Sequence, residues 1–259
     1  GNDDELKLYG KKATTEDNLR TLRILKDLDL FFVVLGFIMF GPNSTLETIK
    51  SNITFLFECG HTDNLMVLGN VLMLLRDSNL YRRLVQEGRV TGDVSRFWEL
   101  PSYTFLAPKV ERLSKHWHYG RIYSTYPDTL EVNNLQVNIG NLVARMTNPM
   151  NREILDTLKD EFADFKAAQS DLFTHFGKLQ YEYFMKTIDL VERDGTDEEL
   201  DVSANEFFGE TYSHYLPEYC RLYNDFLDKI RTEKFSLSGL IFKAFHSAMG
   251  ESDSEEFSV

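Results

Sequence analysis

Hydrophobic residues recur along this chain every three to four positions, which is the spacing of amphipathic helices, and no convincing run alternates with the period of two typical of strands. Two patterns support helix starts: residues 44–47 and 203–206 each place a serine three positions before a glutamate, so that the two side chains can satisfy exposed backbone amides. Helix ends are indicated at Gly41-Pro42, Gly60 and Asn148-Pro149. The sequence therefore predicts an all-α fold, an irregular multi-helix bundle.

The most apolar stretch covers residues 30–40 and reads Leu-Phe-Phe-Val-Val-Leu-Gly-Phe-Ile-Met-Phe. It is too short for a membrane-spanning helix, which needs about 20 apolar residues. We therefore predict a buried core helix here and expect no transmembrane insertion. A further helix is predicted before the basic segment, from the spacing of Leu65, Leu68, Leu72 and Leu75.

A heptad pattern marks residues 151–191. Apolar side chains fall on its a and d positions, with only Gln169 polar in the series: Leu155, Leu158, Phe162, Phe165, Leu172, Phe176, Leu179 and Tyr183. Either one long helix or a helical hairpin broken at Gly177 would produce this pattern. The acidic run that follows, residues 192–201, is predicted to be a loop from its composition.

Glycines and prolines interrupt residues 89–127 more often than the flanking sequence. We therefore expect two helical lobes, an N-terminal lobe over residues 1–88 and a C-terminal lobe over residues 128–250. Residues 89–127 form a basic, aromatic connecting region between them, and residues 251–259 form an acidic tail.

Charge is distributed unevenly along the 259 residues, whose net charge is −13. Residues 1–75 carry a net charge of −3, residues 76–121 carry +4, and residues 122–259 carry −14. A basic middle between acidic ends indicates a charged partner or self-association.

Basic and aromatic residues alternate in this middle segment, a combination that proteins use to bind single-stranded RNA through phosphate pairing and base stacking. The candidate nucleic-acid-binding residues are Arg82, Arg83, Arg89, Arg96, Lys115, Trp117 and Arg121. The alternative interpretation is that the arginines pair with carboxylates of the same chain and that the aromatic rings belong to the core. The net charge of −13 also argues against a free-standing nucleic-acid binder.

Sequence motifs of the common enzyme classes are absent: there is no phosphate-binding glycine loop, no nucleophile elbow and no zinc-binding His-Glu-x-x-His. Glu206, Glu210, His214 and Glu218 recur every four residues, which indicates either a solvated polar face or, less favourably, an acid/base site. Cys59 and Cys220 cannot form a disulfide framework, and no cysteine pair has the spacing of a zinc site. We expect no cofactor, no metal and a reducing intracellular compartment.

The function that these observations favour is that of a non-enzymatic structural or assembly subunit, which acts through protein partners or self-assembly. The alternatives are an RNA-encapsidating nucleocapsid or coat protein with a basic groove between its lobes and, more weakly, an enzyme that uses the Glu206–Glu218 stripe. The last residues could also add as a strand to a carboxylate-binding groove of a partner, with Phe257 and Val259 on one side.

Overall fold

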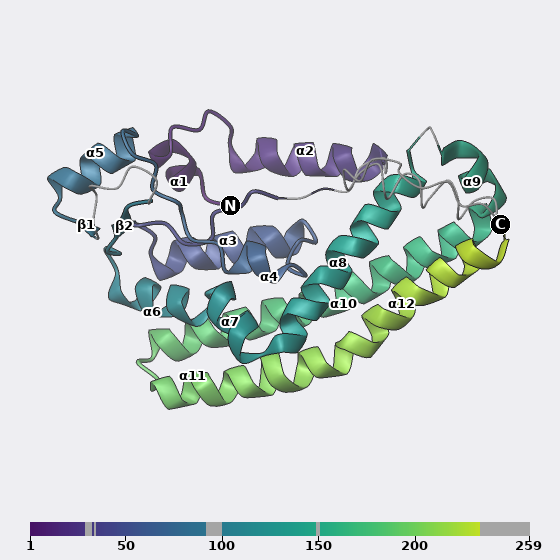
Figure 1. The fold of residues 1–259 in the computed structure, drawn as a ribbon. Helices are drawn as coiled ribbons and strands as arrows, with labels where there is room; N and C mark the ends of the chain where they lie inside the picture. The colour runs from purple at the N-terminus through teal and green to yellow at the C-terminus, as the bar shows by residue number, and fades with distance from the viewer. Residues whose placement is uncertain (29–32, 34, 92–99, 149–150, 234–259) are drawn as a thin grey trace, which may run out of the picture.

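Helices make up most of the described chain, which comprises residues 1–28, 33, 35–91, 100–148 and 151–233 of a computed structural model (Figure 1). In chain order the helices are α1 (Asp3–Leu8), α2 (Thr15–Leu28), α3 (Leu46–Glu58), α4 (Leu65–Leu68), α5 (Asn79–Gln86), α6 (Pro108–His116), α7 (Tyr119–Thr125), α8 (Pro127–Met146), α9 (Arg152–Thr157), α10 (Lys159–Glu192), α11 (Asp197–Ala204), the π-helix η2 (Asn205–Thr211) and α12 (Tyr212–Glu233). Two short strands, β1 (Val90–Thr91) and β2 (Ser102–Tyr103), pair antiparallel and make the only sheet of the described residues. The all-α prediction is confirmed.

Helix α12 packs against both α8 and α10, and α3 packs on α10. Helices α1 and α2 lie above α3, on the far side from α10 and α12 (Figure 1). One cluster of buried side chains runs through these elements, from Met39 to Ile230, and includes Trp117 of the predicted connecting region. The boundaries of the two lobes stay a prediction.

Most of the heptad pattern lies on one helix, α10, whereas Leu155 belongs to the short helix α9 and Leu158 is the N-cap of α10. Helix α10 has 34 residues and runs without a break through Gly177, so the hairpin alternative is wrong. A Cβ at position 177 would lie only 3.0 Å from Thr62 Oγ1 and 3.2 Å from Asp63 N, and Thr62 donates to the Gly177 carbonyl at 2.8 Å. Glycine therefore lets the loop after α3 approach the helix backbone, and it does not end the helix.

The apolar stretch at residues 30–40 is not a helix where the structure describes it. Residues 35–39 are extended, and Phe40 forms a parallel bridge with Val71. Phe40 N donates to the Asn70 carbonyl at 3.1 Å and Leu72 N donates to the Phe40 carbonyl at 2.9 Å. An unbroken apolar run without a polar face fits a buried strand as well as a helix, which explains the wrong prediction.

The helix predicted over residues 65–75 is also too long. Only α4 forms, Gly69 is a turn residue, and residues 70–75 are not helical. A Cβ at Gly69 would lie 2.2 Å from the Trp117 carbonyl oxygen, so this glycine permits close approach of the α6–α7 connection. The pairing of residues 70–72 with Phe40 then supplies the backbone hydrogen bonds that a longer helix would have made.

Both predicted capping boxes are displaced. Helix α3 is capped by Thr45 with Thr48, and α11 is capped by Thr196 with Glu199. The box expected at residues 203–206 lies where α11 continues into η2, and the acidic run is a loop only up to Thr196. In each case a threonine supplies the capping hydroxyl, which a search for serine and glutamate overlooks.

Two sequence-based predictions fall outside the described residues: the role of Arg96, and the acidic tail with Phe257 and Val259. Both cysteines are free thiols. None of the helices in the described ranges combines the length and the apolar character that crossing a bilayer requires.

Candidate functional site

The predicted nucleic-acid-binding residues divide into two groups by what they contact. Arg82, Arg83 and Arg89 belong to α5 and the turn after it, whereas Lys115 and Arg121 lie on α6 and α7. Arg82 donates to Asn79 at 3.3 Å within its own helix. The contacts of the other predicted basic residues show whether either group is available to bind phosphate.

The basic side chains of α6 and α7 face the acidic run around α11. Arg121 pairs with Asp201 at 2.8 Å, and Arg112 pairs with Asp197 at 2.6 Å. Lys109 pairs with Asp194 at 2.8 Å. Lys115 pairs within its helix with Glu111, at 2.7 Å. These side chains therefore follow the alternative interpretation of the sequence, in which the basic residues pair with carboxylates of the same chain.

Trp117 lies in the core. The ring is fully buried, its Nε1 donates to Thr187 Oγ1 at 2.9 Å, and it packs on Phe184 with centroids 4.4 Å apart. Burying a tryptophan with its N–H satisfied is a large stabilising contribution. The ring is thus enclosed by protein and does not offer a face on which a base could stack.

Arg89 is placed by the end of α5. Gly88 has φ of +67°, its N–H donates to the Val85 carbonyl at 3.0 Å, and Arg89 N donates to the Leu84 carbonyl at 2.9 Å. This is the Schellman arrangement, in which glycine takes the left-handed conformation that closes a helix. The chain then enters β1. The Arg89 side chain contacts the loops that contain Pro42, Asn43 and Thr104.

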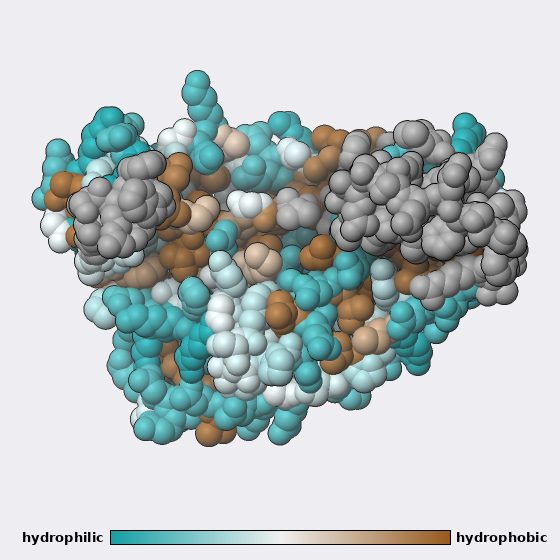
Figure 2. Space-filling model, in the orientation of Figure 1, coloured by the Kyte–Doolittle hydropathy of each residue, from teal (hydrophilic) through white to brown (hydrophobic). Residues whose placement is uncertain are grey.

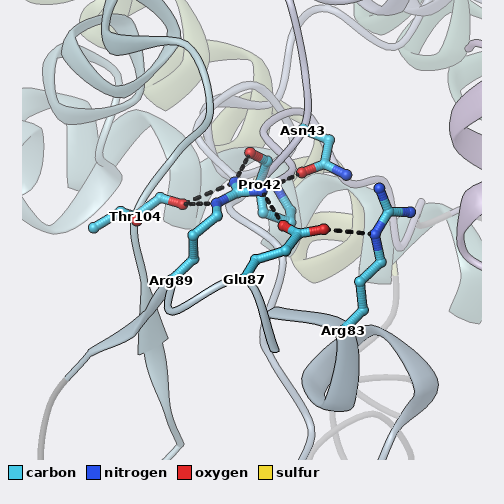
Figure 3. Close-up of polar contacts among 6 residues, drawn as sticks. All are labelled: Pro42, Asn43, Arg83, Glu87, Arg89 and Thr104. Carbon is cyan, nitrogen blue, oxygen red and sulfur yellow. Dashed lines mark hydrogen bonds and ion pairs between the residues drawn. The ribbon is translucent and has the colours of Figure 1, made fainter. Parts of the chain in front are cut away.

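The Arg89 guanidinium connects three segments of the chain (Figure 3). Nη1 donates to Asn43 Oδ1 at 2.6 Å and pairs with Glu87 at 2.9 Å. Nη2 donates to the Pro42 and Thr104 carbonyls, and Nε donates to the Thr104 carbonyl at 3.1 Å. The Arg89 side chain is only 12% exposed, whereas its partners Glu87 and Thr104 reach the surface. We call this set of contacts the Arg89 clamp.

Glu87 completes the clamp. Its carboxylate accepts from Arg83 Nε at 2.8 Å as well as from Arg89. Hydrogen bonds from Arg83 and Arg89 lower the pKa of Glu87, so the carboxylate is charged at neutral pH. Two of the predicted phosphate-binding arginines thus share one carboxylate of the same chain.

The clamp fixes the backbone of the hairpin. Thr104 N donates to the Arg89 carbonyl at 2.9 Å, and Leu106 N donates to the Pro42 carbonyl at 2.8 Å. Tyr103 Oη donates to the Leu72 carbonyl at 3.0 Å, which ties β2 to the segment after α4. Residues 42–43, 72, 87–91 and 102–106 are therefore held together by polar contacts.

Large apolar side chains on or beside these segments are exposed to solvent. Met73 is 69% exposed, Leu75 60%, Leu100 52% and Leu106 67%. We call these four residues the hairpin patch. Figure 2 shows hydrophobic surface in a band between the α1–α2 layer and the helices below it. Sequence reasoning missed the patch because leucines at helical spacing assigned Leu75 to a helix, and that pattern does not distinguish exposed apolar side chains from buried ones.

The Glu/His stripe lies on an outer face. Glu206, Glu210 and His214 are exposed, and Glu206 pairs with Lys186 at 3.4 Å. Phe207 and Tyr212 of the same helical run point into the core. The positions match the solvated polar face that the sequence allowed. In the described parts of the chain, no cluster of three or more histidine, cysteine, aspartate or glutamate side chains could hold a metal ion.

A buried polar cluster that the sequence did not reveal joins α8, α10 and α12. Gln136 Nε2 and Gln180 Nε2 donate to the Asp63 carbonyl oxygen at 2.9 and 2.6 Å, and Tyr212 Oη donates to Gln180 Oε1 at 3.1 Å. Part of Asp63 reaches the surface, but its carboxyl group is enclosed, and this burial raises its pKa to about 7. The fold therefore contains one carboxyl group that titrates near neutrality.

His116 is the buried histidine of the aromatic core. Its Nε2 lies 2.8 Å from Tyr183 Oη, and the ring is packed beside Trp117. Burial, together with the nearby charge of Arg121, lowers the pKa of His116 to about 4. The imidazole is therefore neutral at pH 7.

No protein-family model matches the sequence, and neither a curated protein nor a solved structure is significantly similar to it. The function is therefore inferred from the residues of this chain.

Proposed function

We propose that this protein is a non-enzymatic structural subunit that assembles through protein–protein contacts made by the hairpin patch. The observation that carries the proposal is the exposure of Met73, Leu75 and Leu106 beside segments that the Arg89 clamp and the Tyr103–Leu72 hydrogen bond hold in place. Exposed apolar surface on a rigid frame is typical of interaction sites, because burial stabilises a contact without a large cost in ordering.

The ion pairs of α6 and α7 support protein contacts over the alternative of RNA encapsidation. Arg112 and Arg121 would have to exchange Asp197 and Asp201 for phosphate, and the surrounding acidic segment would repel it. The apolar side chains of the hairpin patch would not have to exchange ion-pair partners in order to bind another protein.

The effect of salt concentration on binding distinguishes assembly through protein contacts from RNA encapsidation. Two copies with a net charge of −13 repel each other, and salt screens that repulsion. Association through an apolar patch therefore strengthens as salt rises, whereas RNA binding weakens steeply because it depends on released counterions.

The test is light scattering of the purified protein over a range of concentrations, at low and high salt. We expect a mass above the 30.1 kDa of the single chain, and a return to that mass in a chain carrying Met73→Ser and Leu106→Ser. Val202→Ser is the matched control, because Val202 is 59% exposed on α11, outside the patch. A 30.1 kDa species under all conditions would overturn self-assembly through this surface.

A further inference from the structure

A cavity of about 490 Å³ lies between α1, α2, the extended segment at residues 35–38 and α3. Its walls are largely apolar, and they include Leu6, Leu22, Leu25, Leu35, Phe37 and Phe55. Phe37 and Phe55 stack with ring centroids 5.9 Å apart. Cavities of roughly 300–1,000 Å³ with apolar walls and a few convergent polar groups are typical of small-molecule sites. The hairpin patch lies on other segments of the chain.

Two hydrogen-bond acceptors meet on the α1–α3 side of the cavity. The Glu5 carboxylate accepts from Asn52 Nδ2 at 3.0 Å and from the Ser44 hydroxyl. Asn52 Nδ2 also donates to the Met39 carbonyl at 3.3 Å. Both partners of the Asn52 amide nitrogen are acceptors, so the orientation of the side-chain amide is fixed. The amide oxygen, Oδ1, takes part in neither of these hydrogen bonds.

Asn52 Oδ1 is a buried acceptor without a hydrogen-bond partner in the structure. The residue is only 1% exposed. A buried carbonyl oxygen that accepts no hydrogen bond carries a desolvation cost, which a donor brought by a ligand would remove. Gly1 lines the cavity beside this oxygen, and its α-amino group interacts with Glu5, so a ligand's ammonium head would take the place of that group.

We propose that this cavity binds a small amphiphile with an apolar body and a primary ammonium head. The body would lie along the leucine and phenylalanine walls, and the head would donate to Asn52 Oδ1 and pair with Glu5. An anionic head would meet the Glu5 carboxylate and would leave the Asn52 acceptor unsatisfied. Lys11 also lines the cavity, but it is exposed, so a carboxylate ligand would have to bind with its head toward solvent.

The experiment uses the fluorescence of N-phenyl-1-naphthylamine as a reporter of binding to the full chain. Dodecylamine, dodecanoate and 1-dodecanol then compete for the site at pH 7.5, below their aggregation concentrations. We expect dodecylamine to displace the reporter at a concentration at least tenfold lower than the other two. Glu5→Gln should reduce this preference to less than threefold.

Two tryptophan variants of α2 locate the site. Leu25 lines the cavity, so Leu25→Trp should fill it and weaken reporter binding at least tenfold. Its neighbour Ile24 is 53% exposed, so Ile24→Trp should leave binding unchanged. Circular dichroism and thermal melting confirm that both variants fold.

Three outcomes would overturn the proposal. Absence of reporter binding, or equal binding by the two tryptophan variants, would show that the cavity is not the site. Displacement by dodecanoate at the same concentration as dodecylamine, or at a lower one, would show that the head group is wrongly assigned.

Discussion

Arg89 donates to the carbonyl oxygen of Thr104 through both Nε, at 3.1 Å, and Nη2, at 2.9 Å. Two strands of two residues each could not hold a hairpin by their own ladder. The guanidinium therefore adds the contacts that fix this end of the molecule, and the hairpin patch depends on them.

Replacing Arg89 by lysine should test that dependence. A lysine keeps the charge but cannot donate to Asn43, Pro42 and Thr104 at once, because it lacks the planar fork. We expect a loss of about 2 kcal/mol in the free energy of unfolding, measured with urea. Arg82→Lys is the control and should change stability by less than about 0.5 kcal/mol. Equal effects of the two variants would show that the clamp is not structurally important.

Asp63 should make the protein less stable as the pH rises through neutrality. Its pKa in the folded protein is about 7, above its ordinary value of 3.8, so the folded state holds a proton that the unfolded state releases between these values. Stability from this group is present below pH 4 and is lost as the pH approaches 7. We expect Asp63→Asn to remove about 2–4 kcal/mol of this dependence in urea titrations at pH 5 and pH 8. Identical profiles of the two proteins would contradict the burial of the carboxyl group.

His116 should have the opposite effect. Its folded-state pKa of about 4 lies below the ordinary 6.5, so acid protonates the unfolded state first. The stability that the neutral ring contributes is complete above pH 6.5 and is lost as the pH falls toward 4. His116→Gln should reduce acid destabilisation by about 3 kcal/mol while keeping a partner for Tyr183. A variant that is as acid-sensitive as the wild type would show that another group is responsible.

Neutralising the acidic partners of α6 and α7 tests the RNA alternative. Asp194→Asn, Asp197→Asn and Asp201→Asn together remove the carboxylates that face Lys109, Arg112 and Arg121. Exposed ion pairs contribute about 0–1 kcal/mol each, so we expect the protein to remain folded. Oligouridine binding, followed by fluorescence anisotropy, should stay weak in both proteins. Tight, salt-sensitive binding that appears in the triple variant would favour nucleic-acid recognition instead.

Helical periodicity predicted the long elements well because each buries a stripe of side chains along its own axis. Phe162, Phe165 and Phe176 could be assigned to one seam, and α10 carries them. The same reasoning failed at Phe40, where the backbone pairs with Val71, a contact between positions far apart in the sequence. Pairings of this kind depend on tertiary structure and leave no periodic signal.

The candidate surface was less predictable for a related reason. The sequence identified Arg89 as a charged residue of interest, but its partners Pro42, Asn43 and Thr104 lie in two separate loops. Trp117 was selected with it as a base-stacking ring, although the fold places it in the core. Composition indicates which side chains could bind a ligand, whereas burial and pairing decide whether those side chains are accessible from solvent.

Photo-crosslinking from the hairpin patch shows whether two copies of this chain meet at that surface. A benzophenone is attached at Leu106→Cys in a chain carrying Cys59→Ser and Cys220→Ser, and the same label at Val202→Cys serves as the control. The account predicts covalent dimers or larger species from position 106, and a yield at least fivefold lower from position 202. Crosslinks that stay within one chain, or equal yields from both positions, would contradict assembly through the hairpin patch.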